Sequence, residues 1–211
     1  HHLYSALARG MPGPAQAPTS FVQVLERIWW RLDRALDGDL NELSARVGTA
    51  EALCCGVTGI VDHHASPTAI AGSLERIARG MAAAGGRGVL CYETTDRHGD
   101  EGFEAGLEEN RRFLARLAAA RDPSRRMAAM VGGHAPFTLS DAHLGALAAL
   151  GASHNCAVHL HVAEDAHDQK DAQARGAADV TERLERSGIL AGEAVIAHGV
   201  HLSEGELDRL A

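Results

Sequence analysis

Residues 157–165, with the sequence AVHLHVAED, place two histidines and two carboxylates directly after an apolar run. The alternation of side chains along a strand puts His159 and His161 on one face. Glu164 lies three residues beyond His161, an odd offset that would place it on the opposite face of a continuing strand. We therefore expect the strand to end near His161, so that Glu164 folds back. His161 is then a candidate metal ligand and Glu164 a candidate general acid/base. The alternative is that both histidines only fill the protein interior.

Polar residues also follow four other apolar runs, at the point where each run ends. They are Asp62, His63 and His64 after the first run, Glu93 and Arg97 after the second, His134 after the third, and His198 after the last. The carboxyl ends of the strands in a β/α barrel form the edge at which barrel enzymes build their active sites. On position alone, His63, His64, Glu93 and Arg97 are candidates for substrate binding, or else structural residues.

The apolar runs alternate with amphipathic helical patterns. Strands are predicted over 56–62, 87–93, 126–133, 155–161 and 193–198, and helices over 69–85, 103–120, 141–152, 175–187 and from 203 onward. This alternation predicts βαβ units and a parallel sheet. Because no glycine-rich phosphate-binding motif follows the first strand, a (β/α)8 TIM barrel is favoured over a doubly wound sheet.

Composition and charge exclude several classes of protein. The net charge of −8 argues against nucleic-acid binding and against an anionic membrane surface. No apolar run is long enough to span a bilayer. The cysteines at 54, 55, 91 and 156 form no CxxC pair and lie in apolar stretches. They are predicted to be reduced core residues, and the protein to be cytoplasmic.

The number of predicted strands is too small for a complete barrel, which usually takes about 250 residues. We expect residues 1–211 to be part of a single metal-dependent (β/α)8 hydrolase barrel, covering about strands 2–6 with flanking helices. The end of strand 1, strands 7 and 8 and any flanking β domain are then expected outside the chain.

Five motifs in a fixed order carry a family resemblance. They are HLYSALARG (2–10), VDHHASP (61–67), GHAPFTLSD (133–141), HLHVAED (159–165) and AHGVHLS (197–203). Together they resemble the aminohydrolase/chlorohydrolase branch of the amidohydrolase superfamily. IWWRLDRALD (28–37), DHHASP and YETTDR (92–97) are most similar to SsnA-type aminohydrolases. The resemblance implies a metal-dependent (β/α)8 barrel.

The resemblance also implies roles for individual residues. His2 matches the second histidine of the family's HxH metal pair, His161 the fifth-strand metal ligand, and Glu164 the acid/base of the HxxE motif. His198 matches the sixth-strand histidine, which orients water or substrate in deaminases and binds metal in binuclear members. His134 matches a fourth-strand residue that hydrogen-bonds the substrate. The first HxH histidine and the eighth-strand aspartate fall outside the chain.

Binuclear members commonly bridge two metals with a carboxylated lysine after strand four, whereas the only lysine here is Lys170, after strand five. We therefore predict one divalent ion, Zn²⁺ in preference to Fe²⁺. The predicted function is a hydrolase acting on carbon–nitrogen bonds other than peptide bonds. As a deaminase it would replace an amino group on a small nitrogen heterocycle with a metal-activated water and release ammonia. The alternatives are a cyclic amidohydrolase that opens a ring C–N bond and a catalytically silent metal-binding scaffold. Family precedent also implies a homo-oligomer.

Overall fold

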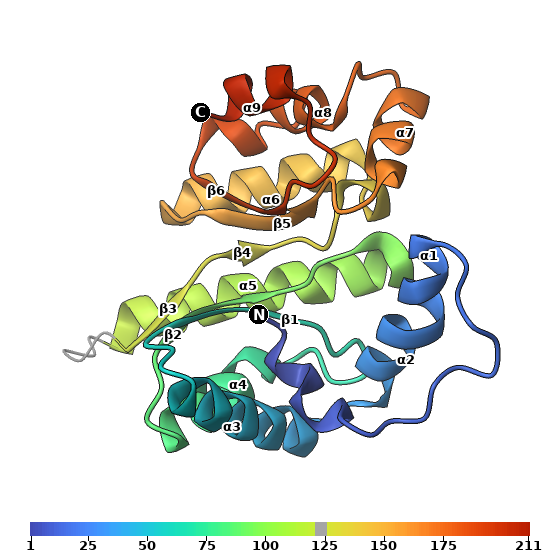
Figure 1. Cartoon of the computed structure of the whole chain (residues 1–211). Helices are drawn as coiled ribbons and strands as arrows, with labels where there is room; N and C mark the ends of the chain where they lie inside the picture. Colours follow the sequence, from blue (N-terminus) through green and yellow to red (C-terminus); the bar gives the residue numbers. More distant parts are fainter. Residues whose placement is uncertain (121–125) are drawn as a thin grey trace. The chain divides into compact units, whose positions relative to one another are not determined.

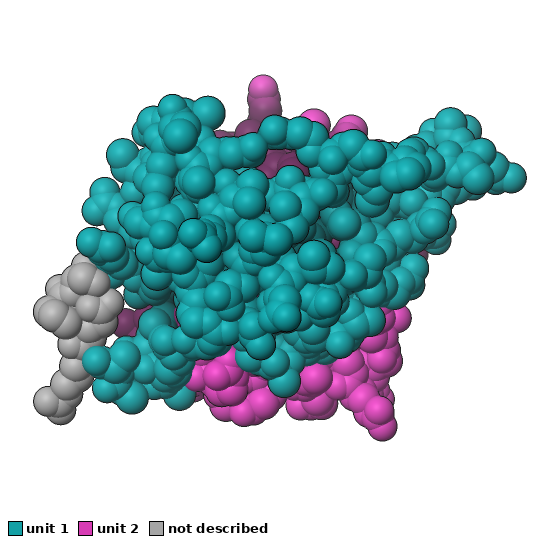
Figure 2. Space-filling model, turned by 90° about the horizontal axis from the view of Figure 1, so that it is seen from below, with its two compact units in different colours: residues 1–91, 115–129 teal, residues 92–114, 130–211 magenta. Residues whose placement is uncertain are grey.

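The computed structural model describes residues 1–120 and 126–211, which fall into two compact units (Figures 1 and 2). Unit 1 contains His1–Cys91 and Ala115–Ala129, and unit 2 contains Tyr92–Leu114 and Met130–Ala211. Each unit carries its own sheet and helices. No helix within the described ranges is long and apolar enough to cross a membrane.

Unit 1 is built on a three-stranded sheet in the order β1-β2-β3. These strands are β1 (Ile60–His64), β2 (Gly88–Tyr92, whose last residue belongs to unit 2) and β3 (Met127–Ala129), and β2 and β3 pair in parallel. The long helices α3 (Gly38–Cys54) and α4 (Ser73–Ala83) pack against each other, and the short helix η1 (Leu3–Ala8) packs on α3. The stretch before α3 is helical but broken into short pieces, α1 (Phe21–Val24), η2 (Leu25–Trp29), α2 (Trp30–Leu32) and η3 (Asp33–Ala35).

The first residue of the chain pairs with β1. The nitrogen of His1 donates to the carbonyl of Val61 at 2.7 Å, and the N–H of His63 donates to the carbonyl of His1 at 2.9 Å. His1 therefore bonds the two residues on either side of Asp62, which is the hydrogen-bond pattern of neighbouring parallel strands. His2 therefore lies beside the carboxyl end of β1.

Unit 2 is built on a parallel sheet in the order β4-β5-β6. Its strands are β4 (Val131–Gly132), β5 (Val158–Val162) and β6 (Ala194–His198). Its helices are η4 (Asp96–His98), α5 (Gly99–Ala120, which continues into unit 1 after Leu114), η5 (Pro136–Thr138), α6 (Asp141–His154), α7 (Ala166–Ala174), α8 (Val180–Arg186), η6 (Ile189–Ala191) and α9 (Glu204–Leu210). Thr94 forms a further parallel bridge with Gly133, next to His134.

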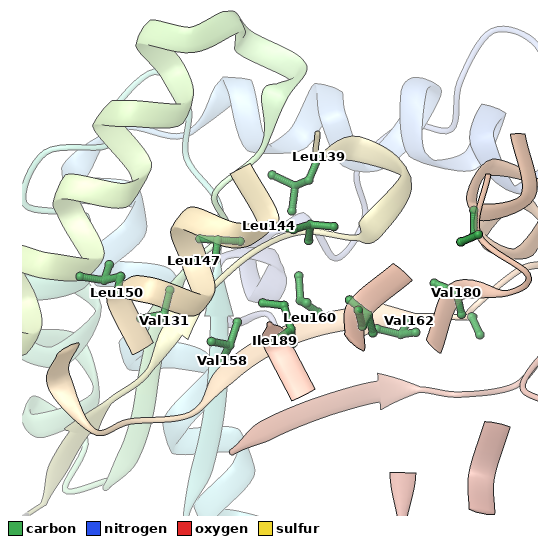
Figure 3. Packing of buried hydrophobic residues seen from close by; sticks show 14 of the residues in the cluster. Val131, Leu139, Leu144, Leu147, Leu150, Val158, Leu160, Val162, Val180 and Ile189 are labelled. Carbon is green, nitrogen blue, oxygen red and sulfur yellow. The ribbon is translucent and has the colours of Figure 1, made fainter. Parts of the chain in front are cut away.

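The core of unit 2 lies between β5 and α6 (Figure 3). Val158, Leu160 and Val162 of β5 belong to one buried apolar cluster with leucines of α6, among them Leu144 and Leu147. All residues of β5 are buried, as expected for a parallel strand covered on both faces. The other face of β5 therefore carries His159 and His161, as the alternation predicted.

Three predicted elements have other boundaries in the structure, and in two of them a glycine with positive φ ends a helix. The strand predicted over 56–62 begins only at Ile60 and runs through His64, because Gly56 (φ 82°) and Val57 close the end of α3 by donating to carbonyls of that helix. The strand predicted over 126–133 is divided into β3 and β4, which belong to different sheets. The helix predicted over 175–187 is only α8, and α7 precedes it, because Gly176 (φ 82°) follows α7 and Asp179 caps α8.

The cysteine prediction was partly wrong. Cys91 is buried and Cys156 is half-buried, but Cys54 and Cys55 are exposed because they lie at the surface end of α3. All four cysteines lie in the described part of the chain, and none of them forms a disulfide there.

Gly88 lies where β2 passes close to β1, and its replacement gives a test of this packing. A Cβ at Gly88 would collide with the main-chain oxygen of Ile60 and approach the Met81 side chain, so the backbone must shift. We expect Gly88→Ala to lower the free energy of unfolding by about 1–3 kcal/mol. Urea unfolding measures this change. Gly59→Ala, which has nothing within 4 Å of its added Cβ, is the control, and equal effects of both variants would contradict the packing described.

Candidate functional site

His161, at the carboxyl end of β5, is held by a single carbonyl group. The oxygen of His134 accepts hydrogen bonds from the main-chain N–H of His161 at 2.9 Å and from its ring Nδ1 at 3.0 Å. Because a carbonyl oxygen can only accept, Nδ1 carries the proton and the ring lone pair is on Nε2. Histidines that bind metals show this arrangement, with one nitrogen donating to a carbonyl and the other presenting its lone pair.

Glu164 turns back toward the strand ends, as the odd offset predicted. β5 ends at Val162, and Ala163 adopts a left-handed conformation with φ 52°. The Glu164 carboxylate then lies 3.4 Å from Nε2 of His198, the last residue of β6. The ring centroids of His198 and His161 are 5.4 Å apart. The structure thus brings His161, Glu164 and His198 together.

Burial raises the pKa of Glu164 above its ordinary value, while the His198 ring opposes the rise. A carboxyl group with a raised pKa accepts and returns protons closer to neutral pH than an exposed one does. Glu164 and His198 each keep about a third of their side-chain surface exposed, at 37% and 36%. The pKa of Glu164 is therefore perturbed while both side chains stay accessible.

His134 joins the same group of side chains. Its ring is 5.7 Å from that of His161, and its Nδ1 lies 2.9 Å from the hydroxyl oxygen of Thr138. That hydroxyl donates to the carbonyl of Ala135, so it accepts the Nδ1 proton of His134. The lone pair of His134 is then on Nε2, which can accept a hydrogen bond from an N–H group.

Glu93 and Arg97, two of the predicted substrate-binding residues, form a buried ion pair with each other in unit 2. The guanidinium of Arg97 donates to Glu93 at 2.7 Å, and its Nε also donates to the hydroxyl of Thr95 at 3.3 Å. Both charges are therefore compensated within the segment that follows β2.

In unit 1, His2 shows the same hydrogen-bond pattern as His161. Its Nδ1 lies 2.7 Å from the carbonyl oxygen of His63, so Nδ1 carries the proton and the lone pair is on Nε2. The next residue is also held by β1, because the N–H of Leu3 donates to the Asp62 carboxylate at 2.6 Å. The ring of His2 lies near those of Tyr4 and Trp29.

His63 and His64, the two predicted substrate-binding residues of β1, are fully buried. Nδ1 of His63 lies 3.5 Å from the thiol sulfur of Cys91. Nε2 of His64 lies 2.9 Å from the hydroxyl of Ser66, and burial lowers the pKa of His64 to about 3, so this ring is neutral at pH 7. Whether either ring contacts a substrate stays a prediction.

Asp168 and His143 are two polar residues with distant partners that the sequence analysis did not single out. Asp168 is only 3% exposed, and Nδ1 of His143 lies 2.7 Å from the Asp96 carboxylate while its ring stacks on Phe103 at 3.6 Å. For Asp168 the signal was present, because a carboxylate in the first turn of a helix can reach back to the preceding loop. For His143 no local signal existed, since its partners are distant in sequence.

Asp62 makes the stability of the folded protein depend on pH. Burial raises the pKa of its carboxyl from an ordinary 3.8 to about 7, against the lowering effect of the Leu3 hydrogen bond. The folded protein therefore holds this proton more tightly than the unfolded chain does. The stabilising contribution is complete below pH 4 and is lost as the pH rises through about 7.

We expect Asp62→Asn to remove this part of the pH dependence. Between pH 4 and 7 the unfolding free energy of the variant should fall less steeply than that of the parent, by at most about 1.4 kcal/mol per pH unit for one proton. Urea unfolding at a series of pH values measures the difference. Asp39→Asn, at an exposed carboxylate, should follow the parent curve. Parallel curves for Asp62→Asn and parent would refute the assignment.

Each unit contains one histidine whose ring is prepared to bind a divalent metal ion. His2 and His161 both direct Nδ1–H to a main-chain carbonyl and carry the lone pair on Nε2. Neutral imidazole nitrogen is a preferred ligand of Zn²⁺ and is also used by Fe²⁺. Lys170 lies exposed in α7, after β5.

Known proteins resemble this chain over most of its length. Residues 1–211 match the amidohydrolase family. The chain is 29% identical over 182 residues to a 5'-deoxyadenosine deaminase of Methanothermobacter thermautotrophicus, covering 86% of this chain and 40% of the relative. It is 27% identical over 224 residues to an 8-oxoguanine deaminase of Pseudomonas aeruginosa, covering 100% of this chain and 48% of the relative.

A solved structure of an adenosine deaminase from Xanthomonas campestris with bound zinc superposes with a TM-score of 0.78 at 20% identity, over 98% of this chain and 44% of that one. This likeness confirms the predicted barrel-type α/β fold. The chain spans less than half the length of each of these three proteins.

Proposed function

The chain belongs to the amidohydrolase family, and on that premise we propose that it carries the central part of a metal-dependent deaminase. Residues 1–211 would form part of one (β/α)8 hydrolase barrel, with the remaining strands supplied by the rest of the protein. The reaction is the hydrolytic replacement of an amino group on a small nitrogen heterocycle, with release of ammonia. The observation that carries the proposal is the contact of Glu164 with His198 beside the His161 ring.

We propose His2 and His161 as ligands of one divalent ion, with Zn²⁺ preferred over Fe²⁺. The support is the hydrogen-bond pattern that each ring shows within its own unit, with Nδ1–H donating to a main-chain carbonyl and the lone pair on Nε2. When bound, such an ion supplies a water molecule whose pKa is lowered from about 15.7 toward about 7.

Proton movement is assigned to Glu164 and His198. Glu164 takes a proton from the attacking water and delivers it to a ring nitrogen, for which its raised pKa is suited. His198, whose Nε2 lies 3.4 Å from that carboxylate, orients the water and stabilises charge as the tetrahedral centre forms. Glu164 then takes the remaining proton from the new hydroxyl group and transfers it to the amino group, so that the C–N bond breaks, ammonia leaves and the ring carbonyl forms.

The substrate is proposed to be a small heterocycle with an exocyclic amino group. The relatives named above are deaminases of 5'-deoxyadenosine, 8-oxoguanine and adenosine. His134 can accept a hydrogen bond from a ring N–H through Nε2. His63, His64, Glu93 and Arg97 remain predictions as substrate-contacting residues, as do a cytoplasmic location and a homo-oligomeric state.

Ammonia release by the intact protein containing this chain tests the proposal. The zinc-loaded protein is incubated with aminopurines and their nucleosides, aminopyrimidines and aminotriazines, with Glu164→Gln as control. Ammonia that depends on Glu164 supports a deaminase. Metal binding without ammonia from any compound favours a cyclic amidohydrolase, which opens a ring C–N bond and is detected with cyclic amides. Inactivity on both classes favours a metal-binding scaffold.

A further inference from the structure

Asp168, in the first turn of α7, is a buried carboxylate that the proposed mechanism does not use. Its Oδ2 accepts a hydrogen bond from the main-chain N–H of Ala163 at 2.7 Å. The main-chain N–H of Phe137, in the loop that follows His134, faces the carboxylate and lowers its pKa against the effect of burial. One side chain therefore binds the loop after β5 and lies against the loop that follows His134.

The residue that Asp168 binds has an unusual backbone conformation. Ala163 is fully buried and has φ 52°, in the left-handed region that residues with a Cβ adopt only at a cost. Such a conformation persists where the surroundings fix it. The N–H of Ala163 is fixed by Asp168, and its carbonyl accepts from the N–H of His201 at 2.9 Å.

The direction of Glu164 depends on this turn, because Glu164 is the next residue. With Ala163 in the left-handed conformation, the Glu164 carboxylate meets His198 at 3.4 Å. An extended Ala163 would continue β5 and send the Glu164 side chain elsewhere. His198 also has a positive φ, 73°, and the following Gly199 donates to the carbonyl of Val162 at 2.9 Å, so the two loops are joined.

We propose that Asp168 is a positioning residue for Glu164, holding Ala163 in its left-handed turn so that the Glu164 carboxylate faces His198. The proposal rests on the proposed function of Glu164 in proton transfer. In this role Asp168 acts only through Glu164. It does not orient the His161 ring, which the main-chain carbonyl of His134 holds.

A double-mutant cycle tests this coupling in the intact, zinc-loaded protein. We expect Asp168→Ala to lower kcat by about 10- to 100-fold with KM within about 2-fold, since a displacement of about 1 Å can cost 10²-fold. In the Glu164→Gln background the same change should cost less than about 2-fold, because the group it positions is already disabled. Asp168→Asn, which keeps an oxygen acceptor for Ala163, should lose less than Asp168→Ala.

A matched control separates positioning from general destabilisation. Asp179 caps α8 by accepting from the N–H of Glu182 at 2.7 Å and binds none of the loop residues above. Asp179→Ala should lower stability while kcat of the folded protein stays within about 2-fold of the parent. Zinc content should be equal in all variants. Equal losses from Asp168→Ala in both backgrounds, or loss of zinc together with activity, would overturn the proposal.

A measurement without turnover tests the proposal even if the deaminase assignment fails. Amide hydrogen exchange at Ala163 should be much faster in Asp168→Ala than in the parent, and Asp168→Asn should retain part of the protection. In both variants Val158 and Leu160 should stay protected. No ammonia from the parent protein would defeat the proposed function alone. Unchanged exchange at Ala163 in Asp168→Ala would defeat the positioning role.

Discussion

Replacement of Glu164 by glutamine is expected to lower kcat for ammonia release by about 10²–10⁴-fold, the range of general acid–base catalysis. Glutamine keeps the shape of the side chain but can neither take a proton from water nor return one. KM should change little, because the substituted group acts on protons rather than on binding. Steady-state ammonia release by the zinc-loaded intact protein measures both parameters.

The matched control for this prediction is Glu193→Gln, at an exposed carboxylate just before β6. It changes the same charge away from the candidate site and should keep kcat within about 2-fold of the parent. Zinc content should be unaffected in both variants. A Glu164→Gln protein with near-parental kcat would remove the carboxylate from the mechanism and leave the proton transfers without a carrier.

Replacement of His161 by alanine is expected to abolish metal binding and, with it, activity. The variant removes an imidazole that the main chain orients through Nδ1, and a metal site with few protein ligands binds its ion much more weakly after losing one of them. We expect less than about a tenth of the parental zinc after dialysis, since even the loss of a group that only orients a ligand costs about 10–100-fold in metal affinity. Metal analysis of the intact protein gives the stoichiometry directly.

His154→Ala provides the control for non-specific zinc binding by surface histidines. His154 lies exposed in the last turn of α6 and should not alter zinc content. Full zinc occupancy in His161→Ala would show that the ion is held by other residues. If activity were lost at full occupancy, the role of His161 would be in substrate binding or water orientation.

Much of the fold was predictable because its signals are local. The parallel α/β arrangement follows from the alternation of apolar runs and helical patterns, and every predicted strand region overlaps an observed strand. Boundaries were less predictable. Gly56 and Gly176 could each have continued a pattern, but both adopt positive φ and terminate helices, a role that depends on how the following residues pack.

Some features of the candidate site were likewise predictable from the sequence, and others were not. The grouping of His161, Glu164 and His198 was predictable, because parallel strands bring their carboxyl ends to one edge and the spacing of Glu164 forces the chain to turn. The pairing of Glu93 with Arg97 and the enclosure of His64 were not, since both depend on which groups surround the end of a strand.

The sequence by itself determined the residue types at the strand ends, the face of β5 that carries His161, and the class of chemistry that these residues can perform. Only the tertiary structure decided which ring nitrogen of His2 and His161 carries the proton, that Asp168 is buried against the turn at Ala163, and that the pKa of Glu164 is raised. The physical reason is that side-chain periodicity is a property of neighbouring residues, whereas tautomers, burial and pKa values depend on groups that folding brings together from distant positions.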